Sequence, residues 1–306
     1  MKHKPSVTIA VCAYNEAQNI VSFLTSVLSQ KEEGFNLEKI LVVSDGSTDE
    51  TVNRVTKLNS PKIETWNLLQ RLGKSPRLNQ IYRALTSDLL VQSDADVTFT
   101  HPHVLRDLIQ PLILEKKVGM CGGNPQPQTG TTFIEKAVNC TTNAFIPLRW
   151  QFRRGQNILS ADGRLLAYQK ELVKKINIPH DMIANDAYTY FCCLTLGYQY
   201  RFVKSASVTY RSPQTISDQI RQNSRFLAAS QRLKKYFPAE IVDHEYQFPK
   251  SILRKQMLTQ FIKHPILCAV IFILNKYCYI RSRLIEPKLT SKWDIAGSTK
   301  KLITHL

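Results

Sequence analysis

Apolar runs alternate with segments of helical periodicity along the first hundred residues of this chain. Strand-type runs occupy residues 7–13, 39–44, 62–67 and 88–93, and helical spacing occupies residues 15–30, 48–58 and 76–86. The runs are short and bounded by turn residues, as expected of buried strands. Strand–helix alternation with short links predicts a doubly wound, mostly parallel α/β sheet with right-handed crossovers.

The alternation becomes less regular beyond residue 96. Helices are expected over residues 103–115, 132–150, 185–196 and 215–236, and strands over 118–122, 198–203 and 207–210, with a turn and a strand within 159–169. A boundary near Pro238–Pro249 would divide the chain into an α/β domain, residues 1–237, and a basic helical extension, residues 238–306.

The charge is strongly positive and unevenly distributed. The chain has 41 Lys and Arg against 24 Asp and Glu, a formal net charge of +17. Residues 201–306 contain 19 basic and 6 acidic side chains, so they account for +13 of that total. A basic excess so confined predicts an anionic partner for the C-terminal third, either a membrane surface or a nucleic acid.

An apolar segment in the same third distinguishes between these partners. Pro265–Leu274 is free of charge, and lysines interrupt the hydrophobic run on either side at Lys263 and Lys276. Ten helical residues cover about half of a ~30 Å hydrocarbon core. Basic residues on both flanks favour an anchor lying in the interface of an anionic membrane, with a buried helix of a soluble subdomain as the alternative. Nucleic acid offers nothing to the apolar run, so no nucleic-acid partner is expected.

The cysteines and the N-terminus bear on location. Seven cysteines form no Cys-x-x-Cys pair, which is typical of buried free thiols in a reducing compartment. The first residues enter a strand without a signal-peptide core. We therefore expect a peripheral or monotopic protein on the cytoplasmic face of the cell membrane.

Acidic motifs follow two of the predicted strands. Asp45 lies within SDGSTD after the second strand, Asp94 and Asp96 form Asp-Ala-Asp after the fourth, and Asn185-Asp186 opens a later helix. Carboxyl ends of neighbouring parallel strands share one edge of a sheet, where such folds bind ligands. Paired carboxylates there suit Mg²⁺ or Mn²⁺ that also holds substrate phosphates. A purely structural acidic pair is the alternative.

Smaller motifs accompany the acidic ones. Tyr14 precedes a predicted helix N-terminus and could stack on a nucleobase, with Asn15 as a helix cap in the simpler interpretation. Ser47 or Thr48 could likewise cap the next helix. Lys74 follows a glycine in a basic loop, which could bring an ammonium to a base or phosphate.

The order of these segments resembles glycosyltransferase family 2, whose members are inverting enzymes with a GT-A fold. CAYNE, SDGSTDET, GKSPRLN, SDADV, NDAYTYFCCLTLGY and QNSRF carry the resemblance over residues 5–235. It implies nucleotide contacts for Tyr14, Glu16, Asp45, Lys74 and Asp94, metal binding by Asp96, general-base catalysis by Asp186, and acceptor or diphosphate contacts for Gln222, Arg225 and Phe226. The chain departs from the family in having Asn185 before Asp186 and Phe226 in place of Trp.

The resemblance implies transfer of a hexose from a UDP- or GDP-sugar to a hydroxyl acceptor, as in the synthesis of cell-envelope polysaccharides. The acceptor would be a lipid, a lipid-linked glycan or a polysaccharide. A binding-only pseudo-enzyme and a basic nucleic-acid-binding protein are the alternatives. A sugar nucleotidyltransferase would need a glycine-rich phosphate loop after the first strand, where this chain has CAYNEA.

Overall fold

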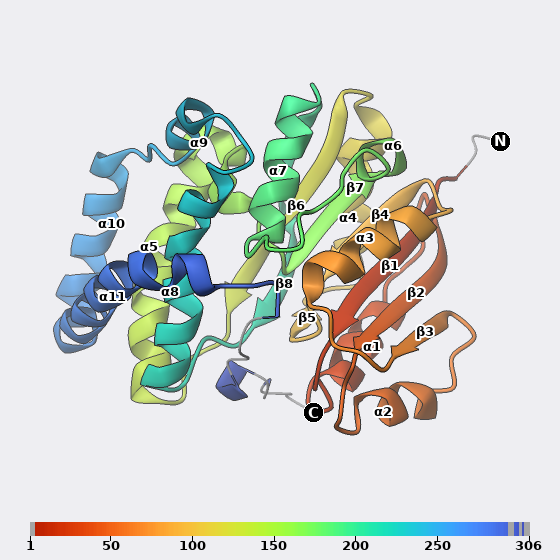
Figure 1. Cartoon of the computed structure of the whole chain (residues 1–306), viewed down its shortest axis with the longest axis horizontal. Helices are drawn as coiled ribbons and strands as arrows, with labels where there is room; N and C mark the ends of the chain where they lie inside the picture. Colours follow the sequence, from red (N-terminus) through yellow and green to blue (C-terminus); the bar gives the residue numbers. More distant parts are fainter. Residues whose placement is uncertain (1–3, 293–296, 300–301, 303–306) are drawn as a thin grey trace.

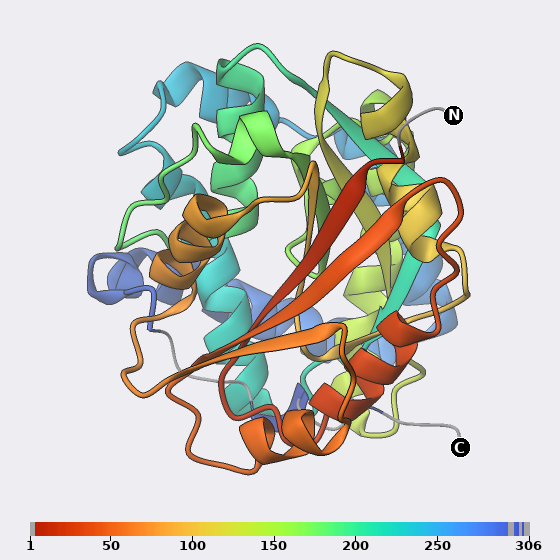
Figure 2. The same cartoon turned by 90° about the vertical axis from the view of Figure 1, so that its right-hand side faces the viewer.

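An eight-stranded sheet runs through the protein, with helices on both of its faces (Figures 1 and 2). The computed structural model describes residues 4–292, 297–299 and 302. The strands are β1 (Ser6–Ala13), β2 (Asn36–Asp45), β3 (Ile63–Leu68), β4 (Leu89–Ser93), β5 (Val97–Phe99), β6 (Val118–Pro127), β7 (Leu165–Gln169) and β8 (Gln199–Tyr210). Their order across the sheet is β3-β2-β1-β4-β7-β6-β8-β5.

The N-terminal half of the sheet is parallel, as the strand–helix alternation predicted. β3, β2, β1 and β4 pair in parallel, so their carboxyl ends share one edge. The other half is mixed, because β7 runs antiparallel to both β4 and β6. The strands expected at 198–203 and 207–210 are one strand, β8, whose register against β6 shifts between Gly122 and Asn124. Lys204 and Ser205 interrupt the apolar pattern of β8 without interrupting the strand.

Two hydrophobic clusters pack against opposite faces of the sheet. The helices of this part are α1 (Ile20–Leu28), α2 (Thr51–Lys57), α3 (Lys74–Ala84), α4 (Val104–Leu114), α5 (Phe133–Gln151), α6 (Lys170–Val173) and α7 (Asn185–Thr195). α1 and α4 bury Phe23 and Leu108 on one face. α3 and α7 bury Tyr82 and Phe191 on the other. Figure 2 shows α1 and α3 on the two sides of the N-terminal strands.

The first helix begins later than the sequence predicted. Asn15 has a left-handed φ of 54°, and α1 starts only at Ile20, after Asn19. The intervening residues instead bond to the loop after β2: Asn15 Oδ1 accepts from the N–H of Thr48 at 2.8 Å, and Asp49 Oδ2 accepts from the N–H of Ala17 at 3.1 Å. The simpler interpretation, that Asn15 caps this helix, is therefore wrong, and hydrogen bonds between the loops after β1 and β2 hold this segment in place.

Helices from the C-terminal third gather at the end of the sheet away from β3 (Figure 1). They are α8 (Ile216–Leu233), α9 (Ala239–Glu245), α10 (Lys250–Lys263) and α11 (Pro265–Ile285). α11 packs along both α5 and α8, and α10 packs against α5. Ile271 of α11 joins Ala137 and Val138 of α5 in a small apolar cluster. The C-terminal helices are therefore packed directly on the α/β part of the chain.

One long apolar helix lies at the surface. α11 continues through Lys276 to Ile285, so it is twice as long as the uncharged run Pro265–Leu274. Among the described residues, Pro265–Lys288 is the single helical segment long and apolar enough to cross a membrane, and only 22% of its apolar window is buried. The alternative of a core helix in a soluble subdomain does not fit so exposed a segment.

Candidate functional site

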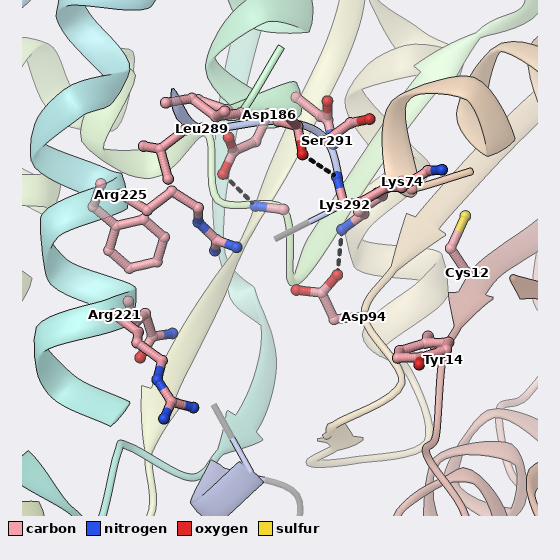
Figure 3. A pocket seen from close by; sticks show the side chains of 18 of the residues that line it. Cys12, Tyr14, Lys74, Asp94, Asp186, Arg221, Arg225, Leu289, Ser291 and Lys292 are labelled. Atoms are coloured by element: carbon pink, nitrogen blue, oxygen red, sulfur yellow. Dashed lines mark hydrogen bonds and ion pairs between the residues drawn. The ribbon is translucent and has the colours of Figure 1, made fainter. Parts of the chain in front are cut away.

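A cavity of about 540 Å³ opens at the carboxyl ends of β1, β2 and β4. Every residue that the sequence singled out for the site lines it: Tyr14, Glu16, Asp45, Lys74, Asp94, Asp96, Asp186, Gln222, Arg225 and Phe226. Figure 3 shows α8 forming one wall, with Asp94 and Tyr14 across the cavity from it. Residues more than 200 positions apart therefore meet in one concave site, the arrangement typical of ligand-binding α/β proteins.

Asp45, at the end of β2, shapes the loop that precedes α3. Its Oδ1 accepts from the N–H of Leu72 at 2.8 Å and from Arg77 Nε at 2.7 Å, and its Oδ2 accepts from the N–H of Gly73 at 2.8 Å. A carboxylate has about four acceptor positions. Three are used within the protein, so about one remains for a ligand. Asp45 therefore fixes the conformation of this loop and still has room to bind a ligand.

Lys74 and Asp94 form an ion pair inside the cavity. Burial lowers the pKa of Lys74, but the charge of Asp94 and the hydrogen bond to it outweigh burial, so the net shift is upward. Lys74 is therefore a cation that holds Asp94 in place. From the sequence, we expected the Lys74 ammonium to contact a base or a phosphate. Lys74 can make that contact only while it remains bonded to Asp94, or by leaving it.

Tyr14 and Arg71 stack at the other end of the cavity. The Arg71 guanidinium lies 4.0 Å from the centroid of the Tyr14 ring. Ser47 Oγ accepts from the N–H of Asn15 at 3.2 Å, which fixes the backbone beside Tyr14. Ser47 and Thr48 do not cap α2, whose N-cap is Glu50. An aromatic face and a planar cation together offer a stacking surface for a nucleobase.

Asp186 is a half-buried carboxylate at the first turn of α7. The N–H groups of Ala187 and Gly163 donate to its two oxygens at 2.8 and 3.1 Å. Burial, followed by the negative charge of Asp162, raises the pKa of Asp186 above its ordinary value. Capping alone does not describe it, because the N-cap of α7 is Ala184. A fixed carboxylate with a raised pKa has the properties of a general base.

Arg225 reaches into the cavity from α8. Figure 3 shows its guanidinium directed toward the space between Asp186 and Asp94. Burial lowers the pKa of Arg225 to about 10, and the charges of Asp186 and Asp94 counter that shift. A guanidinium held in a water-poor site is well suited to offset negative charge that develops there.

The acidic pair that follows β4 has the donor set of a hard divalent cation. Asp96 faces the cavity two residues after Asp94, which Lys74 holds. Among residues 4–292, 297–299 and 302, no three His, Cys, Asp or Glu side chains form a closed cage. Mg²⁺ and Mn²⁺ are commonly held by one or two carboxylates together with substrate phosphates. Asp96 therefore fits a cation that arrives with a phosphorylated ligand.

Sequence reasoning missed two parts of the site. Arg164 lies 3.0 Å from Asp162 Oδ2, and its guanidinium stacks 3.7 Å from the centroid of the Tyr210 ring. Both Asp162 and Arg164 line the cavity. The Asp-Gly-Arg loop before β7 was a usable signal, since a glycine between opposite charges often marks close backbone approach.

The second missed part is the segment after α11. Leu289, Thr290, Ser291 and Lys292 line the cavity, and the backbone of Ser291 packs on Gly73. Arg232, which is buried, holds the segment by donating to Glu286 Oε1 at 2.5 Å and to the Leu289 carbonyl at 3.1 Å. Deleting the C-terminal helices would therefore remove one wall of the cavity. No local pattern in the sequence marks this contact.

Comparison with known proteins yields one family. The sequence model of the family described as Glycosyl transferase family 2 matches residues 8–177. A poly-beta-1,6-N-acetyl-D-glucosamine synthase of Staphylococcus aureus is 24% identical over 226 residues, which are 72% of this chain and 53% of that protein. The chain thus spans about half the length of the curated relatives it matches.

Solved structures share the fold. A mannosyltransferase from Pyrobaculum calidifontis, solved with GDP-Man and Mn²⁺, superposes with a TM-score of 0.62 at 17% identity, covering 99% of this chain and 88% of that one. Staphylococcus aureus TarS, residues 1–349, gives a TM-score of 0.52 at 14% identity over 85% of this chain and 72% of that one. Both likenesses concern the fold, which agrees with the predicted GT-A architecture.

Proposed function

The chain belongs to glycosyl transferase family 2, and from that membership we propose that it transfers a sugar, with inversion, from a nucleotide-sugar donor to a hydroxyl acceptor at a membrane surface. The observation that carries the proposal is the single cavity in which Asp45, Asp94, Asp96, Asp186 and Arg225 converge. Membership alone leaves the chemistry open, whereas this convergence supplies a group for each step.

The donor occupies the end of the cavity formed by β1, β2 and β4. Tyr14 and Arg71 provide a stacking face for the base, and Asp45 has about one acceptor position left for a base N–H or a ribose hydroxyl. The diphosphate lies toward Asp96. Asp96 would hold a divalent cation there, which offsets phosphate charge when bound. The Pyrobaculum mannosyltransferase, solved with GDP-Man and Mn²⁺, supports a divalent metal and a GDP-linked donor, without choosing between Mg²⁺ and Mn²⁺.

Transfer exchanges one bond at the anomeric carbon for another. The acceptor oxygen forms a bond to that carbon while the bond to the diphosphate oxygen breaks on the opposite face. The acceptor's proton passes to Asp186, whose raised pKa favours accepting it. Arg225 offsets the negative charge that develops on the departing diphosphate. Atoms and charge balance with a nucleoside diphosphate as the leaving group.

α11 supports a membrane location for this reaction. Its exposed face carries Ile266, Ile273 and Ile280, which are 71%, 69% and 55% exposed. The opposite face packs on α5 and α8 through buried Cys268, Ile271 and Cys278. A helix that packs on the protein along one side and exposes apolar side chains along the other is suited to lie in the plane of a membrane interface. The basic excess of residues 201–306 suits the anionic cytoplasmic leaflet.

Nucleotide binding tests the proposal. Thermal unfolding of the full chain should be measured with GDP or UDP, each with Mn²⁺, with Mg²⁺ or with chelator. A nucleotide at a hundredfold excess over its Kd stabilises the folded state by about 2.7 kcal/mol. We expect one nucleotide to raise Tm only when a divalent cation is present, and Asp96→Ala to abolish that dependence. If neither nucleotide raises Tm with either metal, the proposed function is wrong.

A further inference from the structure

The cavity extends past the donor end to a wall built by α8 and the end of α11. Four basic residues line it there: Arg221 and Arg225 from α8, Arg281 from α11, and Lys288 just beyond. Arg221 has Asp218 at 3.5 Å. Within the described part of the chain, neither Arg281 nor Lys288 has a carboxylate at ion-pair distance, because nearby Glu286 is engaged with Arg232 and Lys235. Among the residues that the structure describes, the positive charges of Arg281 and Lys288 therefore have no carboxylate within ion-pair distance.

Apolar side chains lie beside these cations. Phe226, Ile285 and Leu289 line the same end of the cavity, and Phe226 is 50% exposed. The exposed stripe of α11 leads directly to it. At 3.6 residues per turn, Ile273, Tyr277, Ile280 and Leu284 lie on one side of the helix, with exposed fractions from 52% to 72%. Ile280 and Leu284 immediately precede the cavity-lining residues Arg281 and Ile285.

An acceptor that satisfies this wall needs both an anionic group and a hydrocarbon part. A neutral glycan leaves the positive charge of Arg281 and Lys288 uncompensated, and it gains nothing from the aliphatic stripe. A free phosphate uses the cations but not the apolar side chains. A phosphorylated lipid uses both, because its phosphate can bond to guanidinium groups while its chain follows α11 toward the membrane.

We infer that the acceptor hydroxyl is presented on a phosphorylated lipid, whose phosphate is held by Arg281 and Arg221 and whose chain lies along the exposed stripe of α11. The inference rests on the proposed function, since it places this headgroup beside Asp186. Arg225 remains with the donor diphosphate, because it faces Asp94 and Asp186. Lys288 adds charge at the rim of the cavity.

Binding to defined amphiphiles tests this inference without turnover. The full chain in neutral detergent micelles should be titrated with dodecyl phosphate, with dodecanol or with inorganic phosphate. A charge-assisted hydrogen bond contributes about 1.5–3 kcal/mol, so we expect dodecyl phosphate to bind about tenfold or more tighter than dodecanol. Inorganic phosphate should bind more weakly than dodecyl phosphate, because it lacks the chain.

Arg281→Gln should reduce dodecyl phosphate affinity by about tenfold, with Arg221→Gln acting in the same direction. Arg281→Lys should retain most of the affinity. Arg283→Gln is the matched control: it removes one positive charge two residues away on the same helix, at an exposed position outside the cavity. Equal losses in Arg281→Gln and Arg283→Gln would mean nonspecific charge attraction and would overturn the inference.

Nucleotide affinity separates this inference from the proposed function. We expect the Arg281 and Arg221 variants to bind GDP or UDP with Mn²⁺ as the wild type does. If they instead lose nucleotide while retaining dodecyl phosphate, these arginines serve the donor and the inference is wrong, although the proposed function stands. If the wild-type protein binds neither nucleotide, the proposed function fails irrespective of the amphiphile results.

Discussion

The two walls of the cavity differ in charge, origin and surroundings. The wall formed by the ends of β1, β2 and β4 contributes carboxylates, and it belongs to a parallel sheet buried on both faces. The wall formed by α8 and α11 contributes guanidinium and ammonium groups, and it continues into an exposed apolar helix. An acidic wall suits a donor that brings a cation, whereas a basic wall suits a ligand that brings its own phosphate. This difference is the basis for our proposal that donor and acceptor bind at opposite sides of one cavity.

Asp186 lies where the two walls meet, and its removal should have the largest effect. Asp186→Asn retains the shape of the side chain and one acceptor oxygen but removes the basicity. We expect kcat to fall by about 10²–10⁴-fold, the typical contribution of a general base. Nucleotide affinity should stay within error of wild type, as measured by titration calorimetry. If the variant instead loses nucleotide affinity, Asp186 takes part in binding the donor together with the acidic wall.

The exposed stripe should govern membrane association independently of the acidic wall. Ile273→Glu with Ile280→Glu removes apolar contact and adds two negative charges at the surface. Burying an Ile side chain contributes about 1.5–3 kcal/mol, so even partial burial of two predicts a loss in vesicle affinity of about tenfold to a hundredfold. Flotation with anionic vesicles measures it.

Two Leu→Glu substitutions elsewhere provide the control for the stripe. Leu69 and Leu114 are 92% and 71% exposed, comparable to Ile273, but lie on the donor side of the molecule and on α4. Leu69→Glu with Leu114→Glu should leave flotation unchanged. If this variant is released from vesicles equally, total charge governs membrane binding. The exposed stripe of α11 would then not be a specific membrane-binding surface.

The segment after α11 contacts the acidic wall of the cavity at Gly73. A Cβ at Gly73 would lie 2.5 Å from the Ser291 carbonyl oxygen, and the residue has a φ of +95°. Gly73→Ala should therefore weaken nucleotide binding on the order of tenfold, because it displaces Ser291 or the loop bonded to Asp45. Its backbone, at φ 95° and ψ 167°, lies in a region that is essentially restricted to glycine, so a Cβ there adds about 1–3 kcal/mol of strain.

A substitution at Gly197 is the control that separates backbone strain from the loss of the contact with Ser291. It has a φ of +79°, and an added Cβ would meet no atom within 4 Å. Gly197→Ala should lower the free energy of unfolding by about 1–2 kcal/mol while leaving nucleotide affinity unchanged. Chemical denaturation and nucleotide titration of the two variants measure both quantities. Equal nucleotide affinities in both would mean that Ser291 has no influence on the donor wall.

Asp162 should have the smallest effect, on the pH dependence alone. Its negative charge is the second cause of the raised pKa of Asp186, after burial. Asp162→Asn removes that charge, so the pKa of Asp186 should fall. Because the base works deprotonated, the acidic limb of the kcat/KM profile should move to lower pH. If the acidic limb stays at the same pH or moves to higher pH, the charge of Asp162 does not raise the pKa of Asp186, and its role is the ion pair with Arg164.

The parallel half of the sheet and the residues of the acidic wall were both predictable from local sequence patterns. Residues adjacent in the chain fix strand periodicity, and parallel strands bring their carboxyl ends to one edge. Asp45, Asp94 and Asp96 were therefore predictable as neighbours from the strand pattern alone, and they do line one cavity. The order of the motifs added Asp186 and Arg225 to the predicted site, and both line the same cavity. The catalytic and binding roles of these residues stay predictions.

The contacts of those residues, and the segments that enclose them, depend on the packing of the whole chain. Asp45 is largely satisfied by the loop before α3, Lys74 is paired with Asp94, and Asp162 raises the pKa of Asp186. Ser291 reaches the Leu72 carbonyl across 219 positions of chain. Such contacts depend on how whole elements pack, and local periodicity carries no information about them. The exposure of α11 is of the same kind, because an apolar helix becomes core or membrane surface only through what packs beside it.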